Sequence, residues 1–215
     1  MQPSTGKIID NSTASLGRRE KRKLEIRSRI EEAAYRLFQQ QGVENTSIEQ
    51  ICVEADVARR TFYGHFANKQ ALLGGLGISR LYNQSEPMLR LLMAEHHSTR
   101  TRLGAMVDYI ASNFAGFGEI DRQLILVAPS IFAEDAERQR EIGNSALASF
   151  THLISAGVEL GDVRDEFSPE ILAAMVVGTL NMLTTSWAMN SDYPFFSSLE
   201  EARGMFQELI CKDPD

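Results

Sequence analysis

The sequence predicts an all-α fold. From about Arg19 onward, apolar residues recur at intervals of three and four, which places them on one face of a helix. Several stretches open with residues that cap helix N-termini. No stretch alternates convincingly between apolar and polar residues, and no hairpin signal is present. With 215 residues, 43% hydrophobic and 24% charged, the chain suits one large or two small packed domains.

The first residues are predicted to form an arm followed by a long helix. Residues 1–17 are polar and lack periodicity, so we expect a disordered arm. A helix is expected from about Arg19 to Gly42, because glycine suits the backbone geometry of a helix C-terminus. The predicted apolar face of this helix consists of Ile26, Ile30, Ala33, Ala34, Leu37 and Phe38.

Two short helices are predicted next, joined by a three-residue turn. Thr46 and Glu49 have the spacing of a capping box that opens the first of them. The turn covers residues 55–57, and Asp56 within it tolerates a left-handed backbone better than most residues do. The second short helix is expected over residues 58–66. The side chains expected inside are Ile48, Ile51, Cys52, Val57, Phe62 and Phe66.

The remaining chain is predicted to be helical throughout. Asn68 is a suitable cap for a helix that begins at Lys69. Ser168-Pro169-Glu170 combines a capping side chain, a first-turn proline and an acidic residue near the positive end of the helix dipole. Ser197 and Glu200 have the spacing of another capping box. The further expected helices cover residues 87–95, 100–116, 120–132, 134–160, 169–189 and 198–211.

Charge is distributed unevenly along the chain. The net charge is −7, yet residues 1–70 contain 12 basic and 9 acidic residues, whereas residues 71–215 contain 10 and 20. Residues 18–29 alone hold seven basic and two acidic residues. A basic head on an acidic body favours DNA binding, because the head meets phosphates while the body is repelled.

Residues 46–66 have the features of a helix-turn-helix. Two short helices rest on a longer one, with an apolar inner face and a polar outer face on the second helix. In such a unit the second helix exposes side chains to base edges in the major groove.

The stretch from Arg27 to Leu73, RxxIxxAAxxLFxxxGVxxTSIxxICxxADVAxxTFYxHFxNKxxLL, resembles the tetracycline-repressor (TetR) family. The matching positions are dense and evenly spaced over about 47 residues. Two positions depart from the family pattern: Asp56 stands where the family often has glycine, and Gly64 stands where a larger residue is common. Gly64 also weakens the end of the second helix.

The resemblance implies a role for several residues of this unit. Arg59 and Arg60 are expected to contact bases, since arginine grips guanine O6 and N7 with two prongs, although either one alone can instead touch phosphate. Tyr63 is expected against a thymine methyl, with phosphate contact or a scaffold role as alternatives. The expected phosphate contacts are Thr46, Ser47, Thr61, His65 and Lys69; for His65, helix capping is the alternative.

Two interpretations of the basic run from Arg18 to Lys23 have equal weight. It is either an arm that follows the DNA backbone or enters the minor groove, or a solvated helix start.

The resemblance also implies a dimer. The uncharged stretch 169–189 and the apolar stripe of 198–211 are expected to form a four-helix interface with the same helices of a partner chain. A helix buried inside a monomer is the alternative. A membrane-spanning helix is disfavoured, because polar residues interrupt the uncharged stretch and its flanks are mostly acidic.

A pocket for a small, largely apolar effector is implied within residues 80–185 or so. Ordinary core packing is the alternative for each candidate. The candidate lining residues are Met88, Leu92, Met106, Tyr109, Asn113, Phe114, Phe117, Phe132, Phe150, Met175 and Trp187.

No catalytic, metal or cofactor motif is present in the sequence. Two cysteines exclude a disulfide scaffold and a four-cysteine zinc site. No apolar run precedes residue 30, so we expect no signal peptide and a cytoplasmic protein. The expected domains are a disordered arm at 1–17, a helix-turn-helix DNA-binding domain at 18–68 and a helical effector-binding and dimerisation domain at 69–215. The predicted function is a ligand-responsive repressor of a palindromic operator. The alternative is an all-helical ligand-binding protein or enzyme with a non-functional DNA-binding head.

Overall fold

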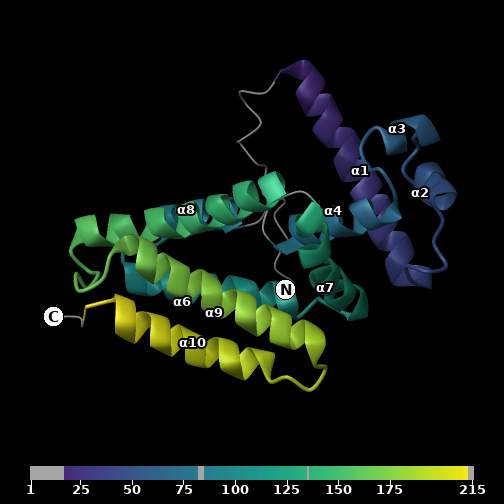
Figure 1. The fold of residues 1–215 in the computed structure, drawn as a ribbon. Helices are drawn as coiled ribbons and strands as arrows, with labels where there is room; N and C mark the ends of the chain where they lie inside the picture. Colours follow the sequence, from purple (N-terminus) through teal and green to yellow (C-terminus); the bar gives the residue numbers. More distant parts are fainter. Residues whose placement is uncertain (1–16, 82–84, 135, 213–215) are drawn as a thin grey trace, which may run out of the picture. The chain divides into compact units, whose positions relative to one another are not determined.

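The computed structural model describes residues 17–81, 85–134 and 136–212, with side chains described outside 78–85 and 128–143. The described residues form ten α-helices and no β-strand, which confirms the all-α prediction (Figure 1). The chain divides into two compact units, Met1–Leu72 and Leu73–Asp215, called the N-terminal and C-terminal units below.

The described residues of the N-terminal unit, 17–72, form three helices and the start of a fourth. Ile30, Ala33, Ala34 and Phe38 form the buried stripe of the first helix, which ends where Gly42 takes a φ of 79°. The helices are α1 (Arg18–Gln41), α2 (Ile48–Glu54), α3 (Arg59–Tyr63) and α4 (Lys69–Leu81), the last of which contains the boundary between the units.

The turn between α2 and α3 has the geometry that the sequence predicts. Asp56 has a φ of 50°, the left-handed conformation that aspartate tolerates at moderate cost. Arg29 of α1 donates hydrogen bonds from Nη2 to the carbonyls of Ala55 and Asp56, both at 2.8 Å. The long helix therefore holds this turn in place. The predicted cap at Asn68 is also confirmed, because its Oδ1 accepts from the amide of Ala71 at 2.8 Å.

Three sequence predictions about helix starts and ends are corrected. The capping box of α2 uses Ser47 and Gln50, one position later than predicted. The second short helix ends at Tyr63, before Gly64, and is shorter than expected because glycine disfavours helix. The last helix begins at Phe195, so the expected cap residues near 197–200 already lie inside it.

The C-terminal unit is a bundle of helices around one apolar core. Its helices are α5 (Ser85–Glu95), α6 (Thr99–Phe114), α7 (Glu119–Glu134), α8 (Ala136–Leu160), α9 (Pro169–Met189) and α10 (Phe195–Ile210). The predicted start of α9 is confirmed: Ser168 caps it, and Pro169 occupies the first turn. Figure 1 shows α9 alongside α10, and α9 also packs on α7 and α8.

The α9 helix is the one helix among the described residues that is long and apolar enough to cross a membrane by length and composition. Core helices of globular proteins meet the same criterion. The α9 helix packs against α7, α8 and α10, but 33% of its most apolar window is buried within the chain, so it is not buried on all sides.

Candidate nucleic-acid interface

Aromatic and aliphatic side chains hold the helix-turn-helix together from inside. Phe62 of α3 is fully buried, and its ring centroid lies 5.8 Å from that of Phe66, which is also buried. Ile51 and Cys52 contribute buried side chains from α2. Because the apolar residues of α3 take the inner face, its polar residues are left to the outer face.

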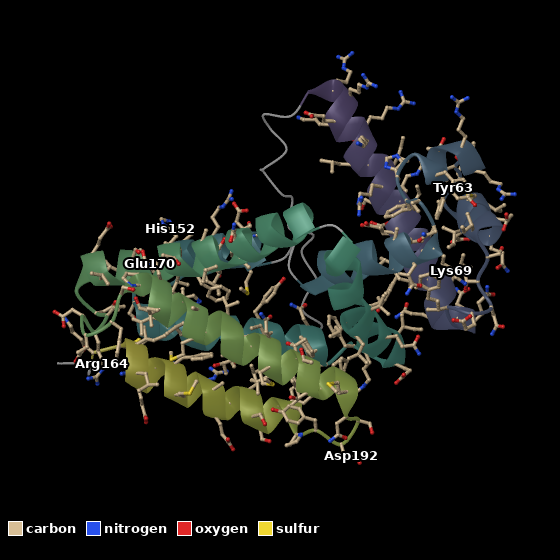
Figure 2. The ribbon with its side chains drawn as sticks, in the orientation of Figure 1. Tyr63, Lys69, His152, Arg164, Glu170 and Asp192 are labelled. Atoms are coloured by element: carbon tan, nitrogen blue, oxygen red, sulfur yellow. The ribbon has the colours of Figure 1, made fainter. Side chains whose placement is uncertain are left out.

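Arg59, Arg60 and Tyr63 are the exposed side chains of α3. Nη1 of Arg59 lies 2.9 Å from Oε1 of Glu49 on α2. A hydrogen bond with Tyr63, and then the charge of Glu49, raise the pKa of Arg59. Tyr63, labelled in Figure 2, is 46% exposed and rests edge-on against Phe62 with the ring centroids 5.5 Å apart. One short helix thus presents two guanidinium groups and a phenol to solvent.

The predicted phosphate contacts Ser47, Thr61 and His65 differ in exposure. Ser47 is exposed at the N-terminus of α2, where its hydroxyl accepts from the amide of Gln50 at 3.1 Å. Thr61 and His65 are half-buried. Burial, and then the charges of Lys23 and Arg27, lower the pKa of His65, so its imidazole is mainly neutral at pH 7.

Thr46 and Lys69 hold the connection between α1 and α2. The hydroxyl of Thr46 is buried and donates to the carbonyl of Gly42 at 2.8 Å. This burial differs from the exposed position that a phosphate contact through the hydroxyl requires. Nζ of Lys69 (Figure 2) donates to the carbonyls of Val43 at 2.8 Å and Thr46 at 3.1 Å. Its ammonium therefore has structural partners in addition to any phosphate.

The sequence does not reveal two functional features of this unit. Glu49, predicted to be a cap residue, is the ion-pair partner of Arg59. Arg29, predicted only to belong to a basic run, fixes the turn of the helix-turn-helix. Charge at these positions was visible, but the pairing depends on how α1, α2 and α3 pack.

Most candidate effector residues lie in the core of the C-terminal unit. Tyr109, Phe117 and Met175 are half-buried against that core, whereas Asn113 is exposed and lies outside it. Phe132 belongs to α7, and its side chain lies outside the part of the chain whose side chains the structure describes. The buried candidates are Met88, Leu92, Met106, Phe114, Phe150 and Trp187.

Phe114, Trp187 and Phe195 form an aromatic cluster within this core. The ring of Phe114 stacks on Phe195 at 4.3 Å and meets Trp187 edge-on at 5.2 Å. The guanidinium of Arg122 lies 4.0 Å from the centroid of Trp187 and donates to the carbonyl of the same residue. Cation–π contact and hydrogen bonding thus tie α7 to the end of α9.

The two helices predicted to form the dimer expose large apolar side chains. On α9, Ile171, Met182 and Met189 are more than half exposed, at 61%, 66% and 73%. On α10, Phe196 and Leu209 are about half exposed. Exposed apolar side chains along neighbouring helices are typical of a protein interface.

A search of the described residues finds no group of three or more His, Cys, Asp or Glu placed to hold a metal ion.

Known proteins share both the sequence of the N-terminal unit and the fold. Residues 30–76 match the family of bacterial regulatory proteins, tetR family. An HTH-type transcriptional regulator of Staphylococcus aureus is 33% identical over 87 residues, which cover 40% of this chain and 46% of that protein. The fatty acid metabolism regulator protein of Bacillus subtilis is 22% identical over 165 residues, which cover 75% of this chain and 82% of that protein.

A solved structure extends the likeness to the C-terminal unit. FadR of Thermus thermophilus, a TetR-family transcriptional repressor in complex with lauroyl-CoA, aligns with a TM-score of 0.58 and 22% identity. The alignment covers 88% of this chain and 98% of that chain. Residues 30–76 thus carry the sequence pattern of the tetR family of bacterial regulatory proteins, and the chain as a whole has the fold of a TetR-family repressor.

Proposed function

We propose that this protein is a ligand-responsive transcriptional repressor, which binds a palindromic operator as a dimer and is released by a small, largely apolar effector. The observation that carries the proposal is the outer face of α3, where Arg59, Arg60 and Tyr63 are exposed over the buried Phe62. A short helix with exposed arginines on a locked helix pair suits base-edge readout in the major groove.

The surface of the C-terminal unit supports the proposed dimerisation through α9 and α10. One helix-turn-helix contacts few base pairs, so specific readout needs two copies whose spacing matches two half-sites. The exposed Ile171, Met182 and Met189 on α9, with Phe196 and Leu209 on α10, supply apolar surface for a partner chain. A four-helix interface of these elements buries that surface.

Effector release is supported by the apolar core and by α4. Met88, Met106 and Phe150 give the core flexible and aromatic side chains that suit an apolar ligand. The Thermus thermophilus repressor of this fold was solved with lauroyl-CoA. Since α4 contains the boundary between the units, a ligand-induced shift of α4 changes the position of the reading helix. A coupling of about 1–3 kcal/mol lowers operator affinity roughly 5–150-fold.

We propose that the outer face of α3 binds DNA and has no catalytic role. We also propose that the protein acts in the cytoplasm. The outer face of α3 offers donors for bases and phosphates. The other relatives named above are regulators in their own descriptions.

The test begins with a duplex enriched from a random library on the purified protein. Electrophoretic mobility shift then compares wild type with Arg59→Ala and Arg60→Ala, and with Arg90→Ala, an exposed arginine of α5, as the control. We expect each α3 variant to lose about 1–3 kcal/mol of binding free energy while the control is unchanged. Unchanged affinity in both α3 variants contradicts the proposal. Addition of lauroyl-CoA and other apolar compounds to the wild-type complex tests release.

A further inference from the structure

The N-terminal half of α1, Arg18–Arg29, extends past the core of the N-terminal unit (Figure 1). None of these residues is buried, whereas the second half of α1 holds the buried stripe from Ile30 to Phe38. The extension contains seven basic and two acidic residues. We call it the basic half of α1. A highly charged helical segment with no fully buried side chain is a surface for a charged partner.

One face of the basic half continues the packing face of α1. That face passes through Leu37, Ala33, Ile30 and Ile26 at intervals of three and four. The same intervals lead next to Lys23 and Arg19, both exposed. Cations therefore replace apolar residues on this face at the point where the helix leaves the core. In the second half of α1 this face is turned toward α2 and α3, and in the first half the same face carries positive charge.

Contacts near the end of α3 show where this cationic face begins. The guanidinium of Arg27 lies 4.6 Å from the ring centroid of Phe66, and Arg27 also pairs with Glu31 at 2.9 Å. Lys23, one turn earlier, is close enough to His65 for its charge to lower the pKa of that imidazole. From Arg27 to Arg19 the helix advances about 12 Å along its axis. Figure 2 shows nitrogen-bearing side chains around this end of α1.

We propose that Arg19 and Lys23 bind backbone phosphates of the DNA that flanks the base pairs read by α3. The inference rests on the proposed function. Duplex DNA carries a phosphate charge about every 1.7 Å of axis, so a cationic helix beside the reading helix meets phosphates at any sequence. Among the described residues, no carboxylate forms an ion pair with Arg19 or Lys23, so both charges are available. These contacts set orientation and affinity, and they carry no base preference.

The experiment uses the full chain and the duplex enriched on it, with dissociation constants measured by fluorescence anisotropy over a range of salt concentrations. The test variant is the double substitution Arg19→Gln and Lys23→Gln. The matched control, Arg18→Gln with Lys21→Gln, removes the same charge from the same helix but on other faces. A second variant, Arg19→Lys with Lys23→Arg, keeps the charge. Circular dichroism verifies that all variants fold.

Each lost phosphate contact lowers the magnitude of the slope of log affinity against log salt concentration by about 0.9. The test variant removes two contacts per half-site, so this slope is expected to fall by about 1.8 per half-site. Affinity is expected to fall roughly 30-fold per half-site at 0.15 M salt. The matched control is expected to lose less than about 3-fold, and the charge-preserving variant to bind as wild type does. Equal losses in the two double variants, or no loss in the test variant, overturn the inference. Arg60→Ala, measured in parallel, separates the two proposals: loss there without loss in the test variant rejects only the phosphate contacts. Failure of the wild type to bind any duplex rejects both.

Discussion

The N-terminal unit exposes guanidinium groups and buries aromatic rings, whereas the C-terminal unit exposes apolar side chains on α9 and α10. Charge follows the same division, with 12 basic and 9 acidic residues before residue 71 and 10 and 20 after it. The first surface suits phosphates and base edges, and the second suits another protein chain. The proposed DNA contact and the proposed self-association therefore lie in separate units, and substitutions in one unit should leave the fold of the other intact.

The largest expected effect comes from emptying the core of the N-terminal unit. Phe62→Ala removes a fully buried ring and is expected to cost about 3–5 kcal/mol. So small a unit is expected to unfold, so DNA binding is lost while the C-terminal unit still melts cooperatively in calorimetry. Phe167→Ala, at a site 61% exposed, is the control and should change little. Wild-type operator affinity in Phe62→Ala contradicts the separation.

A charge on the exposed face of α9 tests self-association. Met182→Glu is expected to give a monomer in sedimentation velocity, because a lone carboxylate in an apolar interface is costly. Operator affinity should then fall at least about 100-fold, since two linked half-site contacts become independent. Val158→Glu places the same charge on α8, where the side chain is also exposed, and should remain dimeric. A dimeric Met182→Glu protein rejects α9 as the interface.

A substitution at Asp162 tests whether the C-terminal unit can lose stability without a change in operator affinity. Its carboxylate accepts from the amide of Thr99 at 2.6 Å and from the hydroxyl at 2.7 Å. Asp162→Ala leaves buried donors of Thr99 unsatisfied and is expected to cost about 1–3 kcal/mol. The Tm of the C-terminal unit should fall by several degrees, with operator affinity at 25 °C unchanged. The exposed Asp165→Ala is the control, and an equal Tm for both variants goes against this assignment.

The smallest expected effect is on the pH dependence of the free energy of unfolding of the N-terminal unit. The pKa of His65 is lowered in the folded state, by burial and then by Lys23 and Arg27. The unfolded chain therefore binds the proton more readily than the folded one. His65 contributes stability above its unfolded pKa of about 6.5, and this contribution is lost as pH falls toward the folded pKa. Chemical denaturation between pH 5 and 7 should show a shallower pH slope in His65→Gln; an identical slope excludes His65 as the cause.

Local backbone chemistry made much of the fold predictable. Gly42, Asp56 and Ser168 act where the sequence indicates, because a left-handed turn or a helix cap depends on few neighbours. Adjacent hydroxyls misled the prediction at α2: Thr46 and Ser47 each have a suitable partner three positions on. The buried bond from Thr46 to Gly42 leaves Ser47 as the cap.

The candidate interface was predictable in its residues but not in its pairings. The exposure of Arg59, Arg60 and Tyr63 follows from helical spacing once Phe62 is placed inside. The ion pair of Arg59 with Glu49 joins α3 to α2, and the bonds of Lys69 to Val43 and Thr46 join α4 to the connection between α1 and α2, so sequence spacing does not reveal them. Asn113 lies on the exposed side of α6, a face that a list of polar residues does not specify.

Base discrimination by α3 is the most direct measurement of function. Wild type and Arg60→Ala are titrated against the enriched duplex and against each of its single base-pair variants. The expected result is that wild type loses about 1–3 kcal/mol at one guanine position, and that Arg60→Ala, or Arg59→Ala in its place, no longer distinguishes that position while retaining discrimination elsewhere. An unchanged discrimination profile in both arginine variants contradicts readout by α3.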